Sequence, residues 1–222
     1  MSEILPKRLA LFDLDGTLTQ TFHANDPSFT RALSKLIDID PHYDYTGEVQ
    51  HPTDEAVFYA LFKKINGTEP TLADREAMID LYLQELMHTY YHKPGFFDEI
   101  PGANELLHEL HHSDQWVVAI ATGAWQRVAQ LKLELAGIHY QHLPLFTSDL
   151  FPDKRRFTQM AIETVGKEHQ LSQITYIGDS NYDYQVSREL GIQFVGIDYR
   201  GIGHLNHLSF CPIYPDLRYV VL

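Results

Sequence analysis

Aspartates stand where two apolar segments of the chain end. Asp13 and Asp15 close the segment LALFDLDGT, and Asp179 follows the apolar run ITYIG, with Asp183 four residues later. Residues two apart in a β-strand point to the same side, so Asp13 and Asp15 can face one point beyond the strand. Two adjacent carboxylates repel at neutral pH, and a bound divalent cation is the simplest way to hold them together. We therefore predict a site for a hard cation with oxygen ligands, although an Asp-Gly turn alone is equally consistent with a plain structural turn.

A hydroxyl and a glycine mark a further strand end. The segment WVVAIATG closes with Thr122 and Gly123, and a helix is expected from Ala124. The hydroxyl and the backbone amides at such a helix N-terminus are suited to bind phosphoryl oxygens. The same pattern is typical of ordinary helix capping, so this motif has weight only together with the others.

Alternating strand and helix patterns predict the fold class. Between the apolar segments lie stretches with helical periodicity, which indicates a parallel sheet covered by helices on both faces. The expected strands are Leu9–Leu14, Trp116–Ala121, Ile174–Ile177 and Gln193–Ile197. The expected helices are Ala103–His112, Trp125–Ala136, Arg155–Lys167 and Tyr182–Leu190.

One long stretch, from about Thr19 to Phe97, contains helical patterns and no convincing strand. Helix starts are predicted at Asp26-Pro27, at Thr53-Asp54-Glu55, and at Thr71 with its capping-box partner Asp74. The sequence therefore predicts an α/β core of residues 1–18 and 98–222, with an all-helical cap domain of residues 19–97 inserted into it.

Composition narrows the classes of partner. A formal net charge of −13 argues against nucleic acid and anionic membranes, and no apolar run is long enough to span a bilayer. Cys211 is the only cysteine, so an intramolecular disulfide is impossible and a reducing cytoplasm is the expected location. The thirteen histidines include two pairs three residues apart, His139 with His142 and His204 with His207. No cysteine or carboxylate pair completes either set, so we expect surface histidines rather than a zinc site.

The ordered motifs together resemble one family. An aspartate motif DLDGT, a strand followed by Thr122, a basic residue and then GDSNYD occur in the order typical of haloacid dehalogenase (HAD) superfamily phosphatases. The segment PGANELL before the second motif also resembles a family helix, and a helical insertion after the first motif resembles the family's cap. This resemblance covers about Leu9 to Asp183 and implies a Rossmann-like parallel sheet.

The resemblance also implies the roles of the site residues. Asp13 would be the nucleophile that becomes an aspartyl phosphate, and Asp15 the general acid and then the general base. Thr122, with Gly123 beside it, would bind the phosphoryl group. The cofactor would be Mg²⁺, held by Asp13, the backbone carbonyl of Asp15 and Asp179, with support from Asp183.

The basic residue is the least clear of these motifs. The family often has a proline after its lysine, which the segment FPDKRRF lacks. Lys154 is our choice, because a compact ammonium fits between a phosphoryl group and carboxylates. Arg155 and Arg156 remain alternatives, as does a plain solvated helix start.

An intact Asp15 favours hydrolysis of phosphate esters, since family members that act on carbon–halogen bonds lack this acid. Sugar phosphomutase is the alternative enzyme class, and a non-catalytic binding module the alternative outside enzymes. A cap that closes over the site implies a small phosphorylated metabolite as the partner. His51 and Thr53 are candidate substrate contacts from the cap, although Thr53 with Asp54 fits helix capping better.

Overall fold

A computed structural model of the chain describes residues 5–50, 52–201, 203, 205–208 and 210–222. Six parallel strands form one sheet in the order β3-β2-β1-β4-β5-β6. Their bounds are β1 Lys7–Phe12, β2 Trp116–Ala121, β3 Leu145–Phe146, β4 Leu171–Gly178, β5 Gln193–Ile197 and β6 Ile213–Tyr214. The predicted α/β class and the four main strands are confirmed, whereas the two-residue edge strands β3 and β6 were not anticipated.

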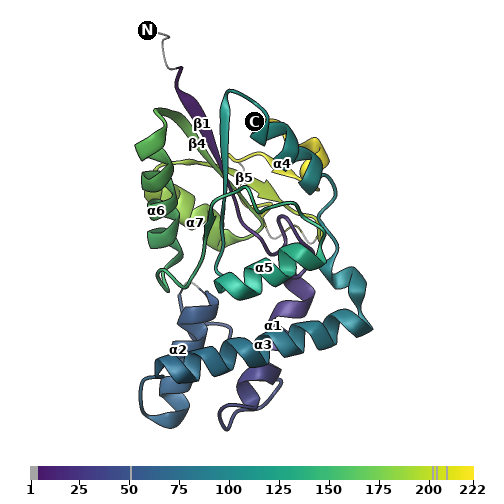
Figure 1. The fold of residues 1–222 in the computed structure, drawn as a ribbon, viewed down its shortest axis with the longest axis vertical. Coiled ribbons are helices and arrows are strands. Elements are labelled where there is room, and N and C mark those ends of the chain that lie inside the picture. Colours follow the sequence, from purple (N-terminus) through teal and green to yellow (C-terminus); the bar gives the residue numbers. More distant parts are fainter. Residues whose placement is uncertain (1–4, 51, 202, 204, 209) are drawn as a thin grey trace.

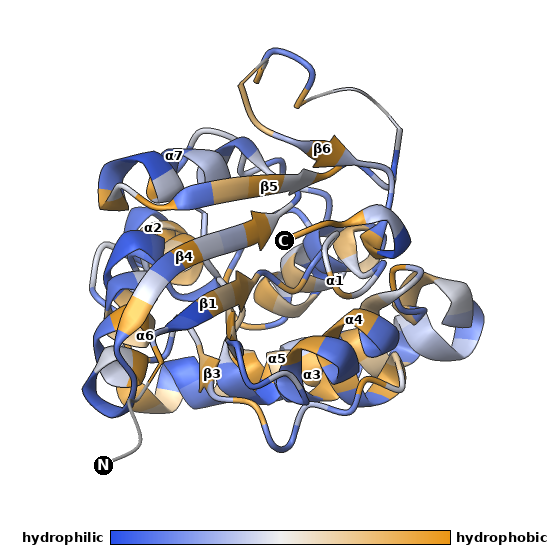
Figure 2. Ribbon diagram, turned by 90° about the horizontal axis from the view of Figure 1, so that it is seen from above, coloured by the Kyte–Doolittle hydropathy of each residue, from blue (hydrophilic) through white to orange (hydrophobic). Residues whose placement is uncertain are grey.

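Side chains of the central strand alternate between two apolar layers. Ala10 and Phe12 belong to one buried cluster, and Leu9 and Leu11 belong to another. The first layer is covered by α4 (Ala103–His111) and α5 (Gln126–Leu135), and the second by α6 (Lys154–Glu168), next to which α7 (Asn181–Leu190) packs. Figure 2 shows these two pairs of helices on opposite sides of the strands. Because both faces are buried, the strands are apolar throughout rather than alternating.

The stretch between β1 and α4 forms helices beyond the carboxyl ends of the strands. Figure 1 shows β1 leading away from the N-terminus toward α1, α2 and α3, which lie at the far end of the molecule. Their bounds are α1 Phe22–Ser34, α2 Asp54–Asn66 and α3 Leu72–His92, followed by the short 3₁₀ helix η1 Pro94–Phe97. None of the described helices of the chain has the length and apolarity needed to cross a membrane.

Two of the three predicted helix starts are confirmed. Thr53 caps α2 by accepting a hydrogen bond from the Ala56 amide, and Thr71 forms a capping box with Asp74 at the start of α3. The prediction at Asp26-Pro27 is wrong, since α1 begins at Phe22 and contains Pro27. Pro27 lies on the exposed side of α1, where the hydrogen bond that a proline removes can be replaced by water.

The helical segment and the sheet share one apolar core. Phe29 of α1 and Phe58 of α2 pack on the indole of Trp125, which is fully buried at the start of α5. The ring centroids lie 6.0 and 5.9 Å from that of Trp125. The domain boundaries at residues 18/19 and 97/98 therefore stay a prediction, since no gap in the packing marks them.

Glu85 of α3 joins this helix to α1 through two ion pairs. Its carboxylate lies 2.7 Å from Arg31 Nε and 2.6 Å from Lys35 Nζ, and the residue is 7% exposed. Burial acts to raise the pKa of Glu85, but the hydrogen bonds from Lys35 and Arg31 prevail and lower it. A lowered pKa in the folded state means that the pair stabilises the fold above the unfolded-state value and that this contribution is lost as the pH falls.

We expect Glu85→Gln to lower the free energy of unfolding at pH 7 by about 1 kcal/mol, since its partners are partly exposed. As the pH falls below about 4.5, the difference from the unsubstituted protein should shrink, because the carboxyl is protonated first in the unfolded state and, at still lower pH, in the folded state. Urea unfolding at both pH values measures this. Glu69→Gln is the matched control, since Glu69 pairs with Lys63 at an exposed site. An equal effect of both substitutions, or one independent of pH, would contradict the assignment.

Candidate active site

Three predicted site residues follow three neighbouring strands. Asp13 comes directly after β1, Thr122 after β2 and Asp179 after β4, and β1 lies between the other two. The Asp13 amide still donates to the Ile177 carbonyl of β4, at 2.9 Å, so the sheet fixes the backbone at Asp13. The motifs are far apart in the sequence and meet because parallel strands end at the same edge.

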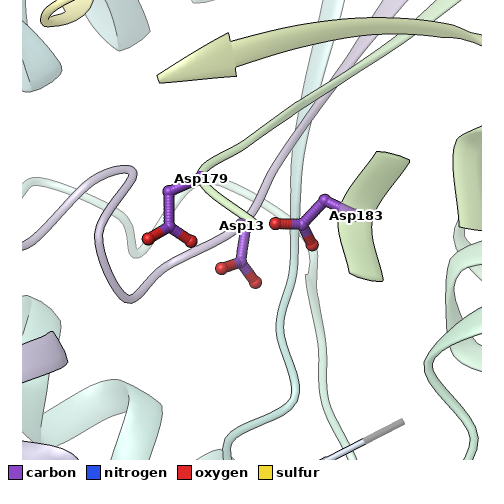
Figure 3. Close-up of side chains that lie close together, drawn as sticks. All are labelled: Asp13, Asp179 and Asp183. Carbon is purple, nitrogen blue, oxygen red and sulfur yellow. The ribbon is translucent and has the colours of Figure 1, made fainter. Parts of the chain in front are cut away.

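A cluster of three buried carboxylates lies at this edge. Asp13, Asp179 and Asp183 each offer one oxygen, and these oxygens all lie within 4.8 Å of one another (Figure 3). The carboxylate of Asp15 is not part of this cluster. Within the described part of the chain, it is the only group of three histidines, cysteines or acids so spaced.

The electrostatics of the cluster indicate a shortage of positive charge. Burial raises the pKa of Asp13 to about 7, an effect that Lys154 opposes and that Asp183 and Asp15 increase. Burial also raises the pKa of Asp179 well above its usual value, with Asp183 and Asp13 adding to the rise. A divalent cation among these oxygens would reverse both shifts, and an all-oxygen donor set fits Mg²⁺. The residues present therefore fit the ion that the sequence predicted.

Two glycines make room for these acids. Gly16 has φ +82°, and a Cβ atom there would lie 2.1 Å from Asp179 Oδ2. A Cβ atom on Gly178 would lie 2.5 Å from the Asp183 carboxyl carbon. No side chain fits at either position, so both glycines are required for the carboxylates to approach one another.

One carboxylate oxygen of Asp183 belongs to the N-terminal cap of α7, and the other faces the aspartate cluster. Its Oδ2 accepts hydrogen bonds from the amide and hydroxyl of Ser180, which closes a capping box on α7. Its Oδ1 lies 2.6 Å from Lys154 Nζ. The cap thereby fixes the orientation of the carboxylate within the cluster.

Lys154, rather than its arginine neighbours, reaches the carboxylates. Its ammonium is buried, lies 3.0 Å from Asp13 Oδ1, and also contacts Asp183. Burial opposes the charged form, yet Asp13 and Asp183 together raise the pKa of Lys154 well above its usual value. Arg155 instead pairs with Glu189 at the surface, and Arg156 lies over the ring of Phe151. The missing proline does not displace the lysine, since Asp153 caps α6 and Lys154 is its first residue.

A second buried lysine was missed by sequence analysis. Lys132 of α5 is 1% exposed, and its Nζ lies 2.9 Å from Asp15 Oδ2. Thr21 donates a hydrogen bond to Asp15 Oδ1. Both oxygens of Asp15 are thus held by partners outside the aspartate cluster. The only indication of this contact in the sequence is a lysine among the apolar positions of an expected helix.

Arg200 is a further cation that no motif indicated. Its Nη2 lies 2.7 Å from Asp179 Oδ2, and its guanidinium lies 4.6 Å from the centroid of the Phe22 ring. The arginine follows β5 in a loop, so only the fold brings it to the site. It connects Asp179 to the first turn of α1.

The expected phosphate site after β2 is partly occupied by protein groups. Thr122 is buried, and its hydroxyl accepts a hydrogen bond from the Ala124 amide, which leaves the hydroxyl proton able to donate. The amides of Trp125 and Gln126, at the start of α5, donate to Asp54 and Asp149. The helix N-terminus is therefore engaged by carboxylates, a pairing that the sequence did not indicate.

The cap contacts the core directly beside this site. Thr53 donates a hydrogen bond to the Pro152 carbonyl, at 2.8 Å, and the Asp54 amide donates to the Gly123 carbonyl, at 2.9 Å. Burial raises the pKa of Asp54 to about 7, which Lys132 and the Trp125 amide oppose. Thr53 thus caps α2 and also joins it to the loop before α6, whereas His51 lies outside the described residues.

A cavity of about 380 Å³ lies between cap and core. Core residues on its wall include Asp13, Asp15, Thr122, Gly123, Lys154 and Asp179. Cap residues on its wall include Asn25, Asp26, Phe29, Tyr45, Thr53, Asp54 and Tyr82. Six predicted core residues and Thr53 therefore line one cavity, together with cap residues that the sequence did not single out, whereas Asp183 is not on its wall.

The histidines gather more closely than expected, but away from this cavity. Rings of His111 and His142 lie 4.2 Å apart, and those of His108 and His112 lie 4.1 Å apart. His139 lines the same surface hollow. Among the described residues, the three aspartates are the only group with the spacing of a metal site, and His204 lies outside these residues.

Comparison with known proteins identifies the family. The family model described as haloacid dehalogenase-like hydrolase matches residues 10–197. The chain belongs to this family. No curated protein sequence matches the chain.

Solved structures share the fold at low sequence identity. A hydrolase from Pseudomonas syringae is 21% identical with a TM-score of 0.68, covering 96% of this chain and 94% of the other. CbbY from Rhodobacter sphaeroides, solved as a mutant with xylulose-(1,5)bisphosphate, is 14% identical with a TM-score of 0.69, covering 97% and 96%. A predicted phosphoglycolate phosphatase from Haemophilus somnus is 19% identical with a TM-score of 0.61, again covering 97% and 96%. The predicted family and the HAD fold are therefore confirmed.

We expect Lys132→Met to reduce kcat for an aryl phosphate by about 100-fold, as loss of a buried charged partner at a reacting group commonly does. The reason is that Asp15 would lose the cation that fixes its Oδ2. Arg127→Met is the matched control, since Arg127 lies on the same helix and forms only exposed ion pairs. Steady-state kinetics of both variants, with thermal unfolding to verify folding, measures this. Equal activity of the two variants would remove Lys132 from the site.

Proposed function

We propose that the protein is a Mg²⁺-dependent phosphatase that hydrolyses a small phosphate monoester through an aspartyl phosphate on Asp13. The observation that carries this proposal is the pairing of Asp13 with Lys154 inside a cluster of buried carboxylates that has fewer positive than negative charges. Such a site suits a dianionic phosphoryl group that arrives with a cation. The phosphatases and hydrolases among the structural neighbours support this chemistry.

Asp13, Asp179 and Asp183 would hold the ion, with the backbone carbonyl of Asp15. When bound, Mg²⁺ would neutralise charge on the phosphoryl oxygens and on the nucleophile. Lys154 lies between Asp13 and Asp183, where it can contact a phosphoryl oxygen without leaving its partners. The Thr122 hydroxyl can donate to another phosphoryl oxygen from the neighbouring strand end.

The two aspartates of the first motif divide the reaction between them. An Asp13 oxygen attacks phosphorus while the bond from phosphorus to the leaving oxygen breaks, and protonated Asp15 gives that oxygen its proton. Asp15 then takes a proton from water, which attacks the phosphorus of the aspartyl phosphate and releases inorganic phosphate. Asp15 is held by Lys132 and Thr21 on the cap side of Asp13, where the leaving group would lie.

Removal of the metal should abolish hydrolysis of an aryl phosphate, and added Mg²⁺ should restore it. Mg²⁺ should also raise the melting temperature of the protein, because binding to the folded state relieves repulsion among the buried carboxylates. Calorimetry and a chelator titration measure both effects. Asp179→Asn should remove the thermal response, whereas Asp114→Asn, at an exposed position before β2 and outside the cluster, should retain it. Full activity in chelator would contradict the metal assignment.

Asp13→Asn should abolish turnover and prevent formation of an acyl phosphate, because an amide is a poor nucleophile. Asp15→Asn should still allow attack on an aryl phosphate with a good leaving group, and the intermediate should accumulate because its hydrolysis lacks a base. Rapid-quench labelling followed by peptide mapping distinguishes the two. A phosphoryl group found on any residue other than Asp13 would overturn the nucleophile assignment.

A further inference from the structure

The cap half of the cavity lies where the leaving group of a bound phosphate ester must go. The phosphoryl group would lie against Asp13 and Lys154, and the cap wall opposite contributes Asn25, Asp26 and Asp54. A cavity of about 380 Å³ is at the small end of ligand pockets in proteins. The side chains of this half are therefore the groups that the leaving group would meet.

The charge of this wall is negative. Asp26 and Asp54 line it, and Asp15 lies at its border with the phosphoryl site. Lys154 is the only lysine or arginine on the cavity wall among the described residues, and its ammonium already contacts two carboxylates. Lys132 is buried behind Asp15 at 1% exposure. A second phosphate or a carboxylate on the leaving group would therefore face anions without a cation to pair with.

The polar groups of the wall suit hydroxyl groups. Asn25 has a buried side-chain oxygen without a hydrogen-bond partner, and this residue lines the cavity. The Asp26 carboxylate accepts one hydrogen bond, from Tyr45, and the Asp54 carboxylate accepts one from the Trp125 amide. A carboxylate accepts more than one hydrogen bond, so both acids retain capacity. An unpaired buried acceptor is unfavourable until a ligand donates to it.

Aromatic rings form another part of the wall. Phe29 makes edge-to-face contacts with Tyr45 and Tyr82, at centroid distances of 5.8 and 5.3 Å, and all three rings line the cavity. Rings held in this way present rigid apolar surface beside the acceptors. Carbon–hydrogen faces alternating with hydroxyl groups, as in a sugar or polyol, match both kinds of surface.

We propose that the leaving group is an uncharged polyhydroxy alcohol, so that the substrate is the monophosphate of a sugar or polyol with no second phosphate or carboxylate. This inference rests on the proposed phosphatase function. The proposal excludes two kinds of substrate: a bisphosphate, such as the one bound by CbbY, and an ester that carries a carboxylate, such as phosphoglycolate.

Matched pairs of esters test the proposal. We expect kcat/KM for glycerol 3-phosphate to exceed that for 3-phosphoglycerate by about tenfold or more. We expect kcat/KM for glucose 6-phosphate to exceed the values for 6-phosphogluconate and for glucose 1,6-bisphosphate by the same factor. In 3-phosphoglycerate a carboxylate replaces the hydroxymethyl group of glycerol 3-phosphate, and in glucose 1,6-bisphosphate a second phosphate is added at C1 of the same ring. 6-Phosphogluconate carries a carboxylate at C1 and also lacks the ring, so the bisphosphate is the closer match to glucose 6-phosphate. A higher kcat/KM for the anionic member in both series overturns the proposal. A tenfold preference for glucosamine 6-phosphate over glucose 6-phosphate also overturns it, because that result would indicate a binding site for a cationic leaving group. An aryl phosphate is the reference: activity on it without activity on any sugar or polyol ester overturns this inference alone, whereas inactivity on it contradicts the proposed function.

A variant identifies the source of the selectivity. Asp26→Asn retains an oxygen that can accept the hydrogen bond from Tyr45. The substitution should lower the ratio of kcat/KM for the uncharged member of each pair to kcat/KM for the anionic member by about fivefold, because an anionic wall residue is lost. Asp80→Asn removes the same charge from an exposed position on α3 and should leave the ratio unchanged. Asp54→Asn removes the other carboxylate of the wall and serves if Asp26→Asn is not folded, as judged by thermal unfolding. Because the pKa of Asp54 is raised to about 7, its effect on the ratio is measured at pH 8, where its carboxylate is charged. Equal ratios in the cavity variants and in Asp80→Asn would overturn the proposal.

Discussion

Repulsion among carboxylates at the ends of β1 and β4 is the constraint on which the rest of the structure depends. Asp13 and Asp179 are buried with Asp183 within a few ångströms, and the raised pKa values of Asp13 and Asp179 show that this arrangement is unfavourable without added positive charge. A protein retains such a cluster only where the strain has a use. The neighbouring elements supply the cations and the helix caps that hold these acids together despite their charge.

Each acid is held by a partner from a different element. Lys154 from the start of α6 contacts Asp13, Lys132 from α5 contacts Asp15, and Arg200 from the loop after β5 contacts Asp179. Four carboxylates thus face three cations, which leaves room for the charge of a metal ion and a phosphoryl group. The hydrogen-bonded caps at Asp153 and Ser180 start α6 and α7 at the positions that direct Lys154 and Asp183 into the cluster.

Residues with local signals could be predicted from the sequence, and those that depend on tertiary packing could not. The buried strands and the caps at Thr53 and Thr71 depend on neighbouring residues, so their positions were right within a few residues. Edge strands β3 and β6 contain two residues each, too few for any periodicity to appear. The start of α1 was misplaced because burial of its apolar face extends the helix upstream of Pro27, against the preference of proline for a first turn.

The same distinction explains the parts of the site that were missed. DLDGT and GDSNYD are motifs because the acids of each lie at one strand end and in the turn or helix start directly after it, which fixes their spacing in the chain. Lys132 and Arg200 have to satisfy only a distance in space, and several helix or loop positions can supply a cation at that distance. The cap wall is less constrained still, since it contacts only the leaving group. Chemistry that is common to a family is therefore encoded in residues a few positions apart in the chain. The choice of substrate is encoded in contacts such as those of Asn25, Asp26 and Tyr45, and these residues meet the site only when the cap packs against the core.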